Sequence, residues 1–257
     1  MIDPPLAERR PPLALVLASL VRADFTVTVK NRRSVLLSML LPIVLLLATN
    51  SGKATDKLGG ALFIIGLAIA YGLTATGILG YALMVARDRD QGVFRRLRVT
   101  PAPGWLLMAS RLGVQVVANF VISLVVLVVG SRMHSLSISA EQYLLVLAIS
   151  VFASAIFLAI GQALVGLMKS ADTVNAGGRI LFAALMFLGL FGASGTLGGA
   201  WEAISRWSPV GIVMRLFASV LDISSWSGTD TLSLLAGAGY IVVCGVVGIR
   251  WFQWDAR

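Results

Sequence analysis

Long apolar stretches, separated by short polar ones, constrain this chain more than any other feature of its sequence. A transmembrane helix needs about 20 apolar residues to cross a hydrocarbon layer of roughly 30 Å. Six stretches approach or exceed that length, at residues 34–50, 58–86, 105–130, 143–168, 175–192 and 232–249. Backbone groups in lipid must be hydrogen-bonded within their own element, and stretches of this length satisfy them as helices. The sequence therefore predicts an all-α polytopic membrane protein with six transmembrane helices.

The composition indicates a single membrane domain over residues 1–257. Hydrophobic residues make up 58% of the chain and charged residues 13%, and the mean hydropathy is +0.89. Soluble domains contain about a quarter charged residues. The formal charge of +9 does not indicate nucleic-acid binding, because no soluble segment combines a basic cluster with aromatic residues.

Residues 13–30 are expected to form an amphipathic helix that lies in the membrane interface. Apolar residues repeat every four positions, at Leu13, Leu17, Val21 and Phe25. Basic residues flank them, as in helices that bind a membrane surface. Asp24 falls on the same apolar side and conflicts with this pattern. A plain cytosolic segment before the first span is the alternative.

Two other segments depart from a simple span. The stretch 58–86 is longer than a bilayer requires, and Gly72, Thr76 and Gly80 recur along it at a spacing of four, which favours close helix packing. Residues 196–231 are too polar for a span and too apolar for a free loop. We expect re-entrant or interfacial helices in that segment, before the last span.

The distribution of arginine and lysine predicts the topology. Fifteen of the 21 basic residues lie in the N-terminal segment, the loop after the second span, the loop after the fourth span and the C-terminal tail, whereas five lie on the opposite face. Short cytoplasmic loops carry the excess of basic residues. Both termini and the loop after the second span are therefore expected in the cytoplasm.

Several kinds of chemistry have no matching residues. The Gly52-Lys53 pair lacks the other residues of a phosphate-binding Walker A loop. A proton relay would require an aspartate or glutamate inside the membrane, and the six predicted spans contain neither in their interior. His134 and Cys244 are single and far apart in the sequence, which predicts no metal site. We expect neither a catalytic residue nor an ATPase site in this chain.

The most charged segment is the loop between the second and third spans, ARDRDQGVFRRLRVTPAPG at residues 86–104. Val93 and Leu97 share one helical face with Phe94 beside them, and Thr100-Pro101 ends the helix. The pattern predicts a short amphipathic helix that can dock on another protein. The alternative is a solvated basic loop that only sets the topology.

This loop resembles that of the membrane subunits of type 2 ATP-binding-cassette (ABC) exporters, which reads acid, basic, acid, any residue, Gly, a short helix and Thr-Pro. The corresponding residues here are Asp88, Arg89, Asp90, Gln91, Gly92 and Thr100-Pro101, with aspartates where the family usually has glutamates. A second family feature resembles Ser194-Gly195, Ser208-Pro209 and Arg215. The likeness extends over nearly the whole chain.

The resemblance implies an efflux permease, most similar to the daunorubicin-resistance type, in a bacterial cell membrane. Residues 92–99 would be a coupling helix that docks on a separate ATPase subunit, and two permeases with two ATPases would form the exporter. The implied coupling residues are Asp88, Asp90, Gly92, Val93, Phe94, Arg95, Arg96, Leu97, Thr100 and Pro101. ATP and Mg²⁺ would bind to the partner, so no cofactor is expected in this chain.

The substrate class stays open. A drug, antibiotic or other amphipathic compound fits the resemblance, and a lipid-linked glycan or lipid exported by the same kind of permease is the alternative. A channel or membrane assembly factor that works without an ATPase is a third possibility of a different class.

Overall fold

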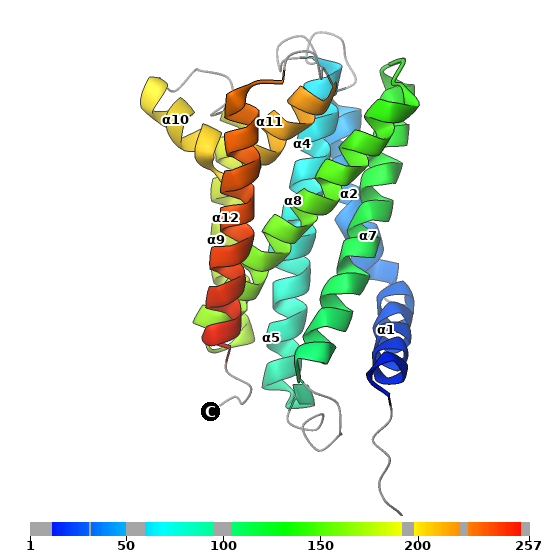
Figure 1. The fold of residues 1–257 in the computed structure, drawn as a ribbon, viewed down its shortest axis with the longest axis vertical. Coiled ribbons are helices and arrows are strands. Elements are labelled where there is room, and N and C mark those ends of the chain that lie inside the picture. Colours follow the sequence, from blue (N-terminus) through cyan, green and yellow to red (C-terminus); the bar gives the residue numbers. More distant parts are fainter. Residues whose placement is uncertain are drawn as a thin grey trace, which may run out of the picture.

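The computed structural model describes residues 12–30, 32–49, 60–94, 104–191, 198–221 and 226–252, apart from the side chains of residues 32–38 and 104. Every secondary-structure element in these ranges is a helix, which confirms the all-α class (Figure 1). In chain order the elements are α1 (Leu13–Lys30), α2 (Arg32–Ala48), α4 (Ala61–Thr74), the π-helix η1 (Ala75–Tyr81), α5 (Ala82–Asp90), α7 (Gly104–Met133), α8 (Ala140–Leu167), α9 (Ala171–Phe191), α10 (Gly199–Trp207), α11 (Pro209–Leu221) and α12 (Gly228–Arg250).

Five helices in the described part of the chain are long and apolar enough to cross a membrane. They are the continuous 30-residue helix Ala61–Asp90, formed by α4, η1 and α5, together with α7, α8, α9 and α12. The first expected span corresponds to α2, which has 17 residues with Pro42 inside it and is therefore about 25 Å long. The helix ends lie within four residues of those expected from the apolar stretches.

The helix Ala61–Asp90 and α8 form the core of the bundle. The most apolar part of Ala61–Asp90 is 78% buried and that of α8 61%, whereas the corresponding parts of α7, α9 and α12 are 17–33% buried. In Figure 1, α8 crosses the long helix obliquely, with α9 and α12 on one side and α7, α2 and α1 on the other. The outer helices therefore leave most of their apolar surface for lipid or for another protein.

Close contact between the two core helices occurs at Gly77, in η1, and not along the expected stripe of Gly72, Thr76 and Gly80. A Cβ atom at Gly77 would lie 2.7 Å from the carbonyl carbon of Phe157 in α8. Gly161 of α8 meets the backbone of Gly77 in the same way. Gly72 instead faces Pro42 of α2, and Gly80 is exposed. The π-helix changes the angular positions of residues along the helix, which explains why a spacing of four did not identify the contact.

We call the end of the bundle that carries residues 87–94 the α5 end and the opposite one the α11 end. The start of α1 and the end of α12 both lie at the α5 end (Figure 1). At the α11 end, the segment expected to be re-entrant or interfacial contains α10 and α11. Nine of the 13 residues of α11 are buried, whereas α10 has one buried residue, Ser205. The segment thus combines a buried helix with an exposed one.

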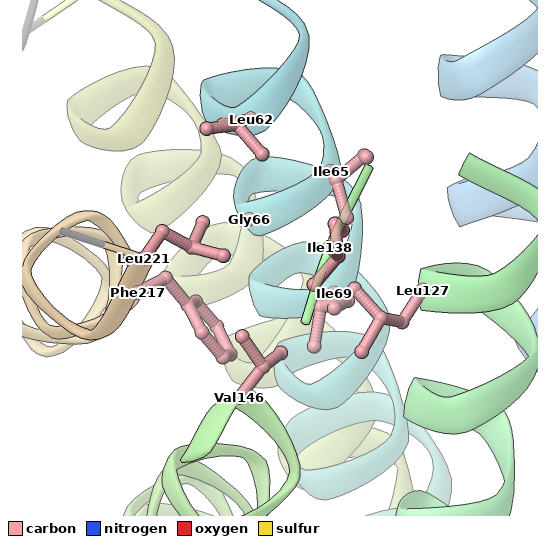
Figure 2. A pocket seen from close by; sticks show the side chains of 9 residues that line it. All are labelled: Leu62, Ile65, Gly66, Ile69, Leu127, Ile138, Val146, Phe217 and Leu221. Carbon is pink, nitrogen blue, oxygen red and sulfur yellow. The ribbon is translucent and has the colours of Figure 1, made fainter. Parts of the chain in front are cut away.

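A small apolar cavity lies between α4, α7, α8 and α11 at the α11 end. Figure 2 shows the side chains around it, which are Leu62, Ile65, Gly66, Ile69, Leu127, Ile138, Val146, Phe217 and Leu221. Its volume of about 10 Å³ gives room for at most one water molecule. A drug-sized compound does not fit there, and the apolar lining does not favour a water molecule either.

Candidate functional site

Three consecutive charged residues at the end of α5, Asp88, Arg89 and Asp90, contact three different helices. Successive side chains of an α-helix point about 100° apart, so neighbouring residues can face different partners. Asp88 contacts α7, Arg89 contacts the end of α8, and Asp90 contacts the start of α9. We call these three residues the 88–90 triplet.

Asp88 belongs to an ionic cluster with Arg111 of α7 and Asp24 of α1. Arg111 Nη1 lies 2.6 Å from Asp88 Oδ2, in an ion pair whose N–H does not point along the hydrogen-bonding direction. Arg111 Nε lies 3.9 Å from Asp24 Oδ1, and Ser110 Oγ donates a hydrogen bond to Asp24 Oδ2. A mostly buried arginine between two partly exposed carboxylates thus links α1, α5 and α7.

Arg89 is buried, with a relative exposure of 2%, and binds the last turn of α8. Its Nη1 donates a hydrogen bond of 2.9 Å to the carbonyl oxygen of Val165, two residues before α8 ends at Leu167. A cation is favourable there because the C-terminal carbonyls of a helix carry partial negative charge. Nε and Nη2 of Arg89 are buried without a hydrogen-bond partner among the described residues, although Asp90 Oδ1 lies 3.7 Å from Nε.

Asp90 binds the start of the next helix. Its Oδ2 accepts a hydrogen bond of 2.7 Å from the backbone N–H of Ala171, the first residue of α9. The N-terminus of a helix carries partial positive charge and unpaired N–H groups, which a carboxylate satisfies. Arg89 and Asp90 therefore place opposite charges on the end of α8 and the start of α9. This arrangement ties the α8–α9 turn to α5.

The helix α5 ends just after the triplet, and the chain then buries Phe94. Gly92 has φ of +69°, a conformation that favours glycine. The Phe94 ring is 1% exposed, packs edge-on against Phe252 at 5.6 Å between ring centroids, and has Arg111 Cζ 5.1 Å from its centre. A cation over an aromatic face is a favourable contact. Phe94 therefore holds the loop against α7 and the segment after α12.

The predicted coupling residues thus lie in different surroundings. Asp88 and Asp90 contact neighbouring helices, a Cβ at Gly92 would have no atom within 4 Å, and Val93 is half-buried. Phe94, expected on the docking face with Val93 and Leu97, points into this chain. The other predicted coupling residues, Arg95, Arg96, Leu97, Thr100 and Pro101, lie outside the described residues. Their role in coupling stays a prediction.

Asp24, Ser110, Arg111 and Phe252 were not identified from the sequence as parts of this site. The sequence offered one sign of this site, which was Asp24 on the apolar side of the expected helix. A carboxylate on an apolar helix face requires a partner. Leu13 and Phe25, on the expected apolar face, are 57% and 54% exposed. The less exposed side of α1 instead consists of Leu17, Leu20, Asp24 and Thr28. Asp24 therefore lies on the side of α1 that packs against α7, together with Leu17 of the expected apolar face.

A second ionic cluster lies at the α11 end. Arg215 Nε of α11 donates a hydrogen bond of 2.7 Å to Oδ1 of Asp230, in the first turn of α12. Asp230 is 2% exposed and also accepts hydrogen bonds from Ser219 Oγ and from the N–H and Oγ of Ser227. Both oxygen atoms of this carboxylate are satisfied, so the cluster fastens α11 to α12.

Comparison with known families identifies the class of this chain. A family model for the ABC-2 type transporter matches residues 16–221, which include both the 88–90 triplet and Arg215. The chain belongs to the ABC-2 type transporter family. A search of curated proteins found no match.

Membership of this family makes the chain the membrane permease component of an ABC transporter. This component is not itself the ATPase. In this ABC-2 permease, Ser208-Pro209, matched earlier to a family feature, begins α11. Ser208 Oγ accepts a hydrogen bond of 3.1 Å from Gly211 N, and Pro209 is the first residue of the helix, a position where its missing N–H costs nothing. Ser194-Gly195 lies outside the described residues.

Proposed function

We propose that this chain is the permease subunit of an ATP-driven exporter that moves a drug, antibiotic or other amphipathic compound out of a bacterial cell. A separate ATPase subunit would bind ATP and Mg²⁺, and a second permease copy would complete the pathway. The α5 end, with both termini, would face the cytoplasm. Family membership supports the ABC permease role, and the basic residues near the α5 end support the orientation.

The observation that carries the proposal is the contact of the 88–90 triplet with three helices. A force applied to the loop after α5 would reach α7 through Asp88 and Arg111, α8 through Arg89, and α9 through Asp90. Rigid-body movement of an ATPase bound to that loop would therefore be passed to most of the bundle. A loop that served only to set topology would not need such contacts.

The position of Phe94 refines which residues would contact the ATPase. Phe94 is buried in this chain, so Val93 and the predicted helical residue Leu97 are left as apolar contacts on that face. A charge at Phe94 would disturb the permease itself and would not report on docking. Val93→Asp and Leu97→Asp are therefore the informative variants, and Gln91→Asp, at an exposed position, is their control.

The test uses inside-out membrane vesicles that contain this chain together with the ATPase encoded in the neighbouring reading frame. We expect a fluorescent amphipathic dye to accumulate with ATP, to continue accumulating after an ionophore collapses the proton gradient, and to stop without ATP. Val93→Asp and Leu97→Asp should release the ATPase, and Gln91→Asp should not. Transport that requires the gradient and not ATP, or full activity of the chain alone, would overturn the proposal.

A lipid-linked glycan or lipid is the second substrate candidate. Aromatic side chains of α9 and α10 form an exposed group at the α11 end, with Phe187 and Phe191 5.0 Å apart and Phe187 and Trp201 6.5 Å apart between ring centroids. Such a surface suits a substrate that stays partly in the lipid. Competition for dye transport by a lipid-linked glycan, but not by the free glycan, would favour this candidate.

A further inference from the structure

A row of polar residues runs along the buried side of α7, from the ionic cluster into the middle of the bundle. Arg111, Gln115, Asn119 and Ser123 follow one another every four residues, and we call them the polar row. Residues four apart lie on the same side of a helix. Asn119 and Ser123 are buried, with relative exposures of 0% and 1%. The exposed side of α7 is apolar and includes Val117, Val121, Leu124 and Val128.

One hydrogen bond within the row and one to α8 involve Asn119. Gln115 Nε2 donates to Asn119 Oδ1 at 3.2 Å, and Asn119 Nδ2 donates to Ser154 Oγ of α8 at 2.7 Å. Ser154 is completely buried. Ser123 Oγ, one turn further along α7, has no hydrogen-bond partner among the described residues. The contact between the row and α8 is therefore concentrated on Asn119.

The position of Asn119 gives this contact its importance. It is 15 residues from Gly104, so it lies about 22 Å along α7, near the midpoint of the helix. At the α5 end, α7 and α8 are both held by the 88–90 triplet, and at the α11 end a short connection joins them. Between these ends, the Asn119–Ser154 hydrogen bond ties the two helices to each other.

Lipid changes what such a bond can do. Apolar side chains gain little by leaving lipid for another helix, so transmembrane helices are held together by close packing and by hydrogen bonds between them. A buried hydrogen bond also fixes which residues of the two helices lie opposite each other. Polar side chains inside a membrane are costly and usually have a function. The polar row begins at Arg111, which is bound to Asp88, and continues along one side of α7.

We propose that Asn119 is a positioning residue of the transport cycle, whose hydrogen bond to Ser154 makes α8 follow α7 when the Arg111 cluster is displaced. This inference rests on the proposed export function. Without the bond, movement of the loop would still reach α7 through Asp88 and the end of α8 through Arg89, but the middle of α8 would slip relative to α7. ATP hydrolysis would then continue with less substrate moved per ATP.

The experiment compares the unchanged chain with four variants, each reconstituted in a complex with the ATPase. Asn119→Leu and Ser154→Ala each remove the bond, and the double variant Asn119→Ser with Ser154→Asn restores it with the two groups exchanged. Ser123→Ala is the matched control, since it removes a buried hydroxyl of the same row that has no partner among the described residues. The readout is substrate transported per ATP hydrolysed, together with the thermal midpoint of each purified chain in detergent.

We expect Asn119→Leu and Ser154→Ala to lower transport per ATP by about threefold, the effect of one interhelical hydrogen bond on an equilibrium. The exchanged double variant should recover most of the loss, and Ser123→Ala should match the unchanged chain. A bond that only stabilised the fold would lower the thermal midpoint and leave transport per ATP unchanged. That result, or an equal loss in Ser123→Ala, would overturn the inference.

The outcomes also separate this inference from the function on which it rests. If the unchanged chain transports with ATP and Asn119→Leu moves as much substrate per ATP, only the proposed role of Asn119 is wrong. If the unchanged chain shows no ATP-dependent transport, the proposed function fails and the coupling role fails with it. The Ser154→Ala variant makes a smaller change and decides the question if Asn119→Leu does not fold.

Discussion

The two ends of the bundle each contain a buried ionic cluster, but the clusters are satisfied to different degrees. At the α11 end, Asp230 accepts hydrogen bonds at both carboxylate oxygen atoms, with distances of 2.6–2.9 Å. At the α5 end, Arg89 and Arg111 each contain two buried nitrogen atoms without a hydrogen bond among the described residues. The side chains of Asp24 and Asp88 are 21% and 25% exposed and that of Asp230 is 3% exposed, so water can replace a lost partner more easily at the α5 end. We expect the α5 end to rearrange during transport and the α11 end to stay rigid.

The largest effect should come from removing the carboxylate of Asp230. In Asp230→Ala, Arg215 and the hydroxyls of Ser219 and Ser227 lose their shared acceptor in a buried site, and we expect a loss of about 3 kcal/mol of stability. Thermal unfolding in detergent measures this loss. Ser233→Ala is the control, because Ser233 is also buried on α12 but bonds only within its own helix, to the carbonyl of Thr229. Equal midpoints for the two variants would contradict a tightly bonded α11 end.

A smaller effect is expected for Arg111→Met. This change leaves the carboxylates of Asp24 and Asp88 without their shared cation, but both side chains are partly exposed, so water reduces the cost to about 1–2 kcal/mol. Adding Asp24→Asn and Asp88→Asn should recover part of the stability, which denaturation of the three forms in one detergent would reveal. If the triple variant is no more stable than Arg111→Met, the three charges do not act as one cluster.

Arg89→Met should have little effect on stability, within about 1 kcal/mol in either direction. The guanidinium is buried with a single hydrogen bond among the described residues, and the cost of burying its charge offsets that bond. Transport per ATP should nevertheless fall, because α5 loses its hydrogen bond to the end of α8. The exposed neighbour Arg87 supplies the control variant Arg87→Met, which should change neither quantity. A stability loss as large as that of Asp230→Ala would show that Arg89 has a structural role.

The smallest effect belongs to the exposed pair of Glu202 and Arg206 on α10. Their charged groups are 3.2 Å apart, but each side chain is about half exposed. Exposed pairs at this spacing contribute at most a few tenths of a kcal/mol. Glu202→Gln should therefore leave the thermal midpoint almost unchanged, and raising the salt concentration should have no further effect. A larger shift would mean that a partner protein covers α10. The comparison of the two ends would then have to include that partner.

The positions of the long helices were predictable because lipid imposes one simple requirement on the sequence. An apolar stretch at 143–168 corresponds to α8 at Ala140–Leu167, and the excess length of the stretch 58–86 corresponds to a helix that continues to Asp90. Hydropathy alone determines such boundaries, since each helix must satisfy its own backbone. The presence of charges after this stretch was equally evident, but their partners were not.

Contacts between distant residues were not predictable from periodicity. Arg111 joins Asp88, 23 residues away in the chain, to Asp24, 87 residues away, only because α1 packs beside α7. The apolar repeat in residues 13–30 did not reveal that Asp24 packs against α7, because in a membrane protein the apolar side of a helix can face lipid and the polar side its neighbours. Asn119 was overlooked for the same reason, since a single polar residue does not interrupt an apolar stretch of α7.

The π-helix η1 has a consequence for the angular direction of α5. Each turn of a π-helix takes up one residue more than an α-helical turn, so the segment rotates everything that follows it about the helix axis. If the same seven residues Ala75–Tyr81 were α-helical, α5 would be turned by about 100°, one residue's share of an α-helical turn. The side chain of residue 89 would then point where that of a neighbour points now, and acidic and basic groups would meet the wrong helix ends. A seven-residue irregularity in the middle of the membrane thus determines which charge meets which helix at its surface.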